Sequence, residues 1–271
     1  RDLGSGTEAF AVGADDPSGG GTVVLVDGAD RWSWLLPGPP GRLGSQVSFA
    51  TLGDGGDGLV LGWWNTVGGN TGALVVPIPA VPEEGIDPVA TADAVLTIAV
   101  QGSFFGGTVG AGDLDGDGID EIAVGSGPEV YDHGRVFVFE GGGGDVVCGV
   151  PGTFPGLALL LDSDAGFDYG YDGSPPIELA DVDGDGAVDL IAGFVMEDGQ
   201  NGRLVVIPGG PGLPSGTVPT DQAPIQIIGP EPLVAFAGSL TPIDDFDGDG
   251  ATDLAVGANR ADDDSGRVYV F

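Results

Sequence analysis

The chain has 271 residues and a formal net charge of −35, with 42 acidic side chains against seven arginines, one histidine and no lysine. Nucleic acids and anionic membrane surfaces attract proteins through clusters of lysine and arginine, so this charge argues against both as partners. Gly 54 and Pro 21 exceed a quarter of the residues, but a hydrophobic fraction of 41% is too high for a disordered chain. We therefore interpret the glycines as turns between strands.

Features of the termini and of single residues limit the cellular location. No stretch approaches about 18 uninterrupted apolar residues, so we expect no direct membrane insertion. Cys148 is the only cysteine, which excludes an intrachain disulfide. The chain begins at Arg1 without a signal peptide, as expected of a processed or excerpted piece.

The predicted elements, taken in chain order, repeat one hairpin five times. A short apolar strand ends at a glycine, and a second glycine with a β-rich run follows eight to ten residues later. The first strands of these hairpins end at Gly13, Gly62, Gly125, Gly193 and Gly257. The runs that follow cover 21–26, 72–77, 134–139, 202–207 and 266–271.

Further strands flank these hairpins. Upstream strands are predicted at 46–52, 106–113, 176–181 and 239–245, and downstream strands at 31–36, 94–100, 157–161 and 225–228. One unit is therefore four antiparallel strands, repeating every 49 to 68 residues, and no amphipathic helix of ten or more residues is predicted. Such units at this period are typical of the blades of a β-propeller.

The number of blades is left open by the ends of the repeat. The first unit begins at its second strand, and the last unit ends after its third strand. Either five blades close with borrowed strands, or the chain is a segment of a larger ring, such as a seven-bladed one. We expect an all-β fold in which residues 1–271 form a single propeller domain with at least five blade units.

Three segments carry the same acidic motif: DLDGDGIDEIAVG at 113–125, DVDGDGAVDLIAG at 181–193 and DFDGDGATDLAVG at 245–257. Each places carboxylates at positions 1, 3, 5 and 9 of a glycine-rich turn before an apolar strand. Calcium takes six to eight oxygen ligands, which alternating aspartates on a tight loop supply. We predict three calcium sites, with position 7 offering its backbone carbonyl. The predicted ligands are Asp113, Asp115, Asp117, Ile119 and Glu121; Asp181, Asp183, Asp185, Ala187 and Asp189; and Asp245, Asp247, Asp249, Ala251 and Asp253.

Other interpretations of these motifs fit less well. An EF-hand needs a glutamate at position 12, where this chain has Val124, Ala192 and Val256 inside predicted strands. Tandem aspartate-rich repeats would lie closer together than these. Asp-Gly runs are also common in plain hairpin turns, but three copies with four aligned acids favour metal binding. Two weaker copies, at 1–13 and 50–62, have lost most of their acids, and we predict no calcium there.

Residues around the acidic loops carry a family resemblance. Phe105 and Gly106 precede the first loop, VGSGP follows at 124–128 and GRVFVF at 134–139, while Phe236–Gly238 stands near the same place in the last unit. With these motifs the chain resembles, over essentially its whole length, the FG-GAP repeats of integrin α-subunit propellers and their bacterial relatives. The resemblance implies that calcium loops join strands 1 and 2 on one face of a disk, while ligands bind loops of the opposite face.

The resemblance therefore directs the search for a ligand site to the other loops. Aromatic rings with a polar tip are good platforms for sugars and proteins. Trp63 and Trp64 are alternatively expected to pack between blades, and His133 to be a surface turn residue. The candidate ligand-binding residues are Trp63, Trp64, Tyr131, His133, Tyr169 and Tyr171.

We expect a calcium-binding recognition or adhesion propeller whose ligand is an extracellular protein or a glycan. Calcium loops suit surroundings rich in calcium, so we expect an extracellular, cell-surface or periplasmic location. The alternatives are a propeller-based polysaccharide-active enzyme, a lyase or hydrolase, and a passive spacer module. No catalytic residue is predicted, because the chain has no lysine, one histidine and no nucleophile motif.

Overall fold

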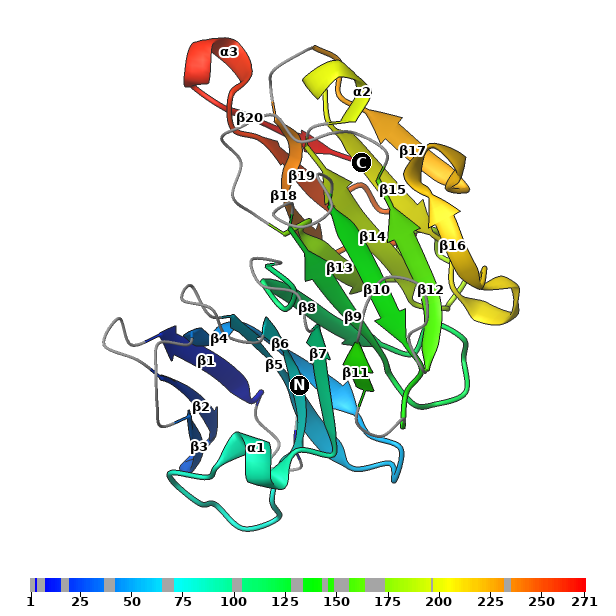
Figure 1. The fold of residues 1–271 in the computed structure, drawn as a ribbon. Coiled ribbons are helices and arrows are strands. Elements are labelled where there is room, and N and C mark those ends of the chain that lie inside the picture. The colour runs from blue at the N-terminus through cyan, green and yellow to red at the C-terminus, as the bar shows by residue number, and fades with distance from the viewer. Residues whose placement is uncertain are drawn as a thin grey trace.

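The structure is a computed structural model, and it describes residues 3, 8–15, 20–36, 42–64, 71–98, 104–127, 134–142, 146–148, 156–163, 174–195, 197–231 and 235–271. Nearly all regular structure in these residues is β-strand (Figure 1). The helices are single turns, α1 (Pro88–Thr91), α2 (Glu197–Gln200) and α3 (Ala261–Asp264), with 3-10 turns at Gly210–Gly212 and Thr220–Gln222. In the described part of the chain, no helix has the length and apolar character needed to cross a membrane.

The strands form five sheets, which we name I to V in chain order. Sheet I contains β1 (Phe10–Asp15), β2 (Gly21–Asp27) and β3 (Asp30–Leu36). Sheet II contains β4 (Arg42–Thr51), β5 (Asp57–Trp64), β6 (Thr71–Pro77) and β7 (Ala94–Ile98). Sheet III contains β8 (Thr108–Gly112), β9 (Glu121–Ser126), β10 (Arg135–Phe139) and β12 (Leu157–Asp162). Sheet IV contains β13 (Ile177–Ala180), β14 (Asp189–Phe194), β15 (Arg203–Ile207) and β17 (Ile225–Ile228), and sheet V contains β18 (Phe236–Ile243), β19 (Asp253–Ala258) and β20 (Arg267–Val270).

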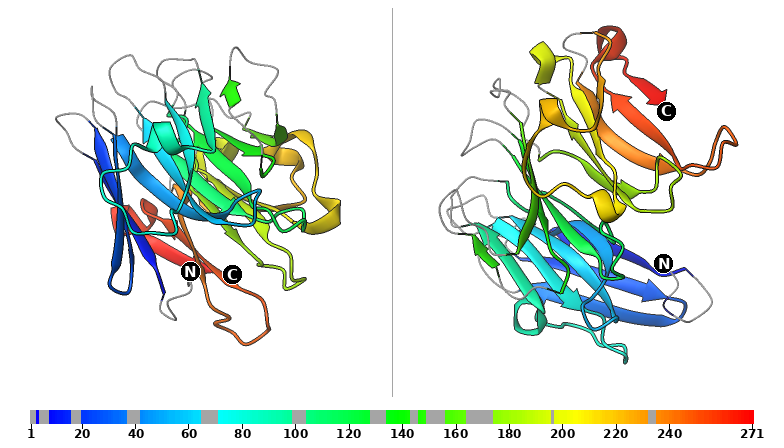
Figure 2. Two further views of the ribbon diagram at one scale, coloured as in Figure 1. Left: turned by 90° about the horizontal axis from the view of Figure 1, so that it is seen from below. Right: turned by 90° about the vertical axis from the view of Figure 1, so that its right-hand side faces the viewer.

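The predicted repeat is confirmed at the level of strands and their order. Consecutive strands within each sheet pair antiparallel, and sheet I begins at the second strand of the unit while sheet V ends after the third. The sheets follow one another along an arc, with sheet I at one end and sheet V at the other (Figures 1 and 2). The described residues do not close this arc into a ring, so five units closing with borrowed strands is not the observed arrangement.

Apolar side chains fill each interface between successive sheets. Leu25 and Trp34 of sheet I pack with Leu61 of sheet II, and Val75 of sheet II belongs to one cluster with Phe137 of sheet III. Two further clusters join sheets III and IV and sheets IV and V. Sheets II to IV are therefore covered on both faces, which explains why β6, β9 and β15 have continuous rather than alternating burial.

The glycine that ends the second strand of a unit lets the next sheet approach closely. A Cβ atom on Gly13 would overlap the carbonyl oxygen of Gly44 in sheet II, and one on Gly193 would overlap that of Ala237 in sheet V. Only glycine leaves room for such contact between backbones. The anchor glycines Gly13 and Gly193 thus mark points where neighbouring sheets touch.

Parallel pairs between sheets were not predicted. After its third strand, sheet II sends residues 83–86 along β3 of sheet I, where Leu35 N donates to Ile86 O at 2.9 Å and Ser33 N donates to Glu83 O at 3.0 Å. In the same way β11 (Val146–Cys148) pairs parallel with β7, and β16 (Gly216–Pro219) pairs parallel with β12. The connection that follows the third strand of one sheet therefore extends the outer edge of the preceding sheet.

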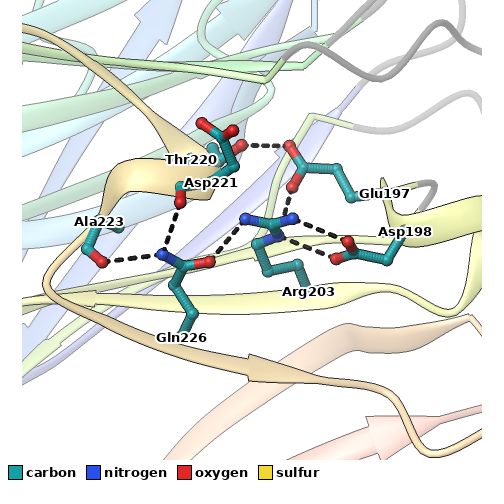
Figure 3. A network of polar contacts seen from close by, with 7 residues as sticks. All are labelled: Glu197, Asp198, Arg203, Thr220, Asp221, Ala223 and Gln226. Atoms are coloured by element: carbon teal, nitrogen blue, oxygen red, sulfur yellow. Dashed lines mark hydrogen bonds and ion pairs between the residues drawn. The ribbon is translucent and has the colours of Figure 1, made fainter.

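A buried ion-pair network holds the connections of sheet IV together (Figure 3). Arg203 at the start of β15 lies 2.8 Å from Glu197 Oε2 and 2.8 Å from Asp198 Oδ1. The Thr220 hydroxyl donates to Glu197, and Arg203 donates to Gln226 Oε1 at 2.6 Å. Glu197 and Arg203 are only 1% and 6% exposed, so each charge depends on the other for compensation.

We expect Arg203→Leu to lower the free energy of unfolding by about 3–5 kcal/mol, because the buried Glu197 carboxylate loses its cation. The matched control is Arg267→Leu, since Arg267 makes the equivalent pair with Asp262 in sheet V but is 37% exposed. Urea denaturation should show a much smaller effect for the control. Equal losses in the two variants would contradict the role given to burial.

Candidate metal centres

The three acidic motifs form the turns that join the first and second strands of sheets III, IV and V. Each turn lies between a closing strand pair: Gly112 with Glu121, Ala180 with Asp189, and Ile243 with Asp253. Position 9 of each motif is thus the first residue of the second strand. This placement holds the last carboxylate on a rigid element while the other acids come from the turn.

Within the first loop, carboxylates accept the backbone N–H groups of the turn. Asp113 accepts from Gly116 N at 2.8 Å and from Gly118 N at 3.0 Å, and Asp115 accepts from Asp117 N at 3.0 Å. Gly116 and Gly118 have φ angles of 85° and 93°, which a glycine adopts without steric cost. The second and third loops repeat these bonds through Asp181 and Asp183, and through Asp245 and Asp247.

In each loop the carboxylates of positions 1, 3 and 9 come together, with one oxygen from each lying within 4.8 Å of the others. These groups are Asp113, Asp115 and Glu121; Asp181, Asp183 and Asp189; and Asp245, Asp247 and Asp253. Hard oxygen donors at this spacing fit a divalent cation such as calcium. These nine residues are among the fifteen ligands predicted from the sequence, and their role in binding a metal stays a prediction.

The remaining predicted ligands lie in the same loops but outside these groups. Asp117, Asp185 and Asp249 are exposed, and each accepts the backbone N–H of the residue two positions later. Those later residues are Ile119, Ala187 and Ala251, whose carbonyl oxygens were predicted as ligands. For all six residues a role in metal binding stays a prediction.

The carboxyl groups at position 9 of the first and second loops have raised pKa values. Burial, with a smaller contribution from the nearby Asp115 carboxylate, raises the pKa of Glu121 to about 7, although the backbone N–H of Leu114 acts to lower it. Burial likewise raises the pKa of Asp189. A carboxyl group that is destabilised in its charged form by burial and by neighbouring acids is one that a bound cation would stabilise.

Backbone contacts link the loops to the preceding sheet, which the sequence analysis did not foresee. Asp120 N donates to Thr51 O at 3.1 Å, and Thr51 N donates back to Asp120 Oδ2 at 2.7 Å. In sheet V, Thr252 N donates to Asp181 O at 3.1 Å, so the third loop contacts the second directly. Asp120 and Thr252 both occupy position 8, and nothing in the motif distinguishes that position from a plain turn residue.

The two acid-poor copies differ from these loops. In sheet II the turn between Thr51 and Asp57 contains only residues 52–56, compared with 113–120 in sheet III. Asp54 Oδ1 accepts from Gly56 N, and among the described residues no three acidic side chains gather at this turn. Of the other copy, 1–13, residues 1, 2 and 4–7 lie outside the described part of the structure.

The candidate ligand-binding residues are only partly described. Trp63 and Trp64 are the last residues of β5. Trp63 is half-buried and packs against the apolar cluster between sheets I and II, as in the packing alternative given for it above. The side chain of Trp64 and the residues Tyr131, His133, Tyr169 and Tyr171 lie outside the described part of the structure.

Glu178 is a third carboxyl group with a raised pKa, and it does not belong to the three clusters. It lies half-buried in β13, and burial raises its pKa from 4.5 to about 7. Because the folded-state pKa lies above the ordinary value, the stability associated with this group is full below pH 4.5 and is lost as the pH rises through about 7.

Glu178→Gln should therefore flatten the dependence of stability on pH between about 4.5 and 7 and raise the free energy of unfolding at about pH 8, on the order of 2 kcal/mol. Urea denaturation at about pH 5 and pH 8 measures this. Glu84→Gln, at an exposed site, is the control. A variant whose pH profile parallels that of the unchanged protein would contradict the expectation.

Comparisons with known proteins agree with the motifs. The FG-GAP repeat family model matches residues 105–139 and 236–271. Integrin alpha-X of Mus musculus is 29% identical over 159 residues, which are 58% of this chain and 13% of that protein. Integrin alpha-PS2 of Drosophila melanogaster is 32% identical over 185 residues, covering 63% and 12% respectively. Integrin alpha-V of Gallus gallus is 27% identical over 191 residues, covering 68% and 16%.

The chain thus spans less than a fifth of the length of each of these relatives. The matched segments contain the first and third acidic loops together with the strands on either side of them. Both the loops and the strand order were expected from the resemblance. The chain therefore carries FG-GAP repeats and is similar in sequence to integrin α subunits, as the motifs predicted.

Proposed function

We propose that the five sheets are successive blades of one β-propeller and that the protein is a calcium-stabilised recognition module. The observation that carries this proposal is the recurrence of one carboxylate cluster at the same turn of three successive sheets. A chemical site that serves a reaction would be expected once, whereas a site that stabilises a repeat recurs with the repeat.

Exposed apolar side chains on the outer faces of sheets I and V support a propeller with more blades than these five sheets. Phe10 and Val12 of β1 are 57% and 55% exposed, and Val268 and Val270 of β20 are 66% and 48% exposed. Each pair lies on the side of its sheet that faces away from the neighbouring sheet. Apolar faces of this kind cover one another elsewhere in the arc, so further blades are the natural cover for them.

Calcium in this proposal is structural. Asp113, Asp115 and Glu121 would hold one ion in the first loop, and the corresponding triads would hold one in each of the other loops. A bound ion supplies positive charge that offsets the repulsion among the carboxylates. Since Thr252 donates to the backbone of Asp181, ordering one loop also orders its neighbour.

Recognition would then use other surfaces of the propeller. The resemblance to integrin α subunits favours an extracellular protein or a glycan as ligand, bound by loops on the face opposite the calcium turns. It also favours an extracellular, cell-surface or periplasmic location. The clustered carboxylates are occupied in holding the loops, so we propose a binding protein rather than an enzyme.

Removal of calcium by excess chelator should lower the melting temperature by several degrees or more. An ion present at about 100 times its Kd contributes about 2.7 kcal/mol per site, and for a chain of this size each kcal/mol corresponds to roughly 2–4 °C. Differential scanning calorimetry measures the shift. A melting temperature unchanged by chelator would contradict structural calcium.

Substitutions distinguish the acidic loops from the acid-poor turn. Asp113→Asn with Asp115→Asn should reduce the calcium stoichiometry by one, because two of the three carboxylates of one cluster are removed. Asp54→Asn, in the acid-poor turn, is the control and should leave it unchanged. Isothermal titration calorimetry measures both.

Binding and catalysis are separated by two screens of the calcium-loaded protein. A glycan array tests for saturable binding, and incubation with acidic and neutral polysaccharides tests for cleavage. Saturable binding without cleavage is the expected result. Turnover of any polysaccharide would contradict the assignment as a binding protein.

A further inference from the structure

We propose that a pocket between sheets II and III binds a small organic cation with an apolar body, such as an aromatic or aliphatic amine. The pocket has a volume of about 350 Å³. This volume lies within the range of known small-molecule sites. None of its carboxylates belongs to the three clusters, although Asp120 lies next to Glu121 in the first acidic loop, and none of the functions proposed above uses the pocket.

The floor of the pocket is apolar and rigid. Val75 of β6, Leu96 of β7 and Phe139 of β10 line it, and all three belong to the cluster that joins sheets II and III. Phe139 stacks on Phe137 with ring centroids 6.4 Å apart, which fixes its position. The ring of Phe139 in this floor can attract a cation as well as apolar groups, as aromatic rings do.

The rim of the pocket carries only negative charge. Asp54, Asp93, Asp120 and Glu140 line it, and none of the lining residues is basic. Asp54, Asp93 and Glu140 are exposed, so the charged rim faces solvent. A cavity lined by one sign of charge above an apolar floor raises the local concentration of ligands of the opposite sign.

The spacing of these carboxylates favours an extended cation over a metal ion. In the described part of the chain, three acidic groups converge within 4.8 Å only in the three acidic loops, and no carboxylate of the pocket belongs to those groups. A metal ion needs several oxygens at short range. An ammonium group on an apolar body needs only separated charges around its head and an apolar surface for the rest.

The pocket opens where the repeat is shortened. In sheet II the turn contains only residues 52–56, compared with 113–120 in sheet III, and Leu52, Gly53 and Asp54 of this short turn line the pocket. A hydrogen bond from Thr51 N to Asp120 Oδ2 holds the Asp120 carboxylate in the rim.

The test titrates the full chain, in calcium-saturating buffer near pH 7, with benzylamine and with its neutral analogue benzyl alcohol. Isothermal titration calorimetry should show benzylammonium binding at least about tenfold more tightly than the alcohol, and more weakly as salt is raised. Similar affinities for the two compounds, or no saturable binding of benzylamine, would overturn the proposal.

Variants locate the binding. Asp93→Asn with Glu140→Gln removes two exposed rim charges and should weaken benzylammonium binding about tenfold. The matched control, Glu8→Gln with Asp30→Asn, makes the same change of charge at two exposed positions, one before β1 and one in β3, and should have little effect. If both double variants weakened benzylammonium binding equally, the ligand would be attracted only by the overall charge of the protein. Binding seen in chelator but abolished by calcium would show a metal site instead. Either result would overturn the proposal.

Discussion

The packing of sheet against sheet is the constraint on which the rest of this structure depends. A sheet inside the arc has a sheet on each side, so its strands must be apolar on both faces, as in β6, β9 and β15. Neighbouring sheets also pack so closely that their backbones touch at some points. No side chain would fit there, which explains why positions 13 and 193 are glycines. The three acidic motifs accordingly lie in turns between strands and not on the faces that pack together.

This separation places the chemistry of the protein at the ends of its strands. The turns between first and second strands gather the carboxylates, and backbone bonds such as that from Thr252 to Asp181 join turns of neighbouring sheets. Glu197 and Arg203 differ from these turns, because their opposite charges are buried together and link two connections of sheet IV. Charge in this protein is either solvated, clustered for a cation, or paired inside.

The strands and the acidic loops could be predicted because both depend on local sequence. An apolar run between glycines forms a strand wherever it repeats, and the DxDGDG motif curls its own backbone through bonds such as that from Gly116 N to Asp113. The parallel strands β11 and β16 could not be predicted, because short segments such as GTVP pair only with an edge presented by another sheet. The buried network around Glu197 was missed for a similar reason, since Thr220, whose hydroxyl donates to Glu197, is distant in the chain.

The sequence by itself determined the strand order, the register of the repeat and the residues that carry carboxylates, since periodicity and turn chemistry act over a few neighbouring residues. Only the tertiary structure decided that positions 1, 3 and 9 of each loop converge and that the five sheets form an open arc. It also decided that the short turn of sheet II borders a pocket with an acidic rim. These features arise from distances between residues of different strands and sheets, which no local pattern encodes.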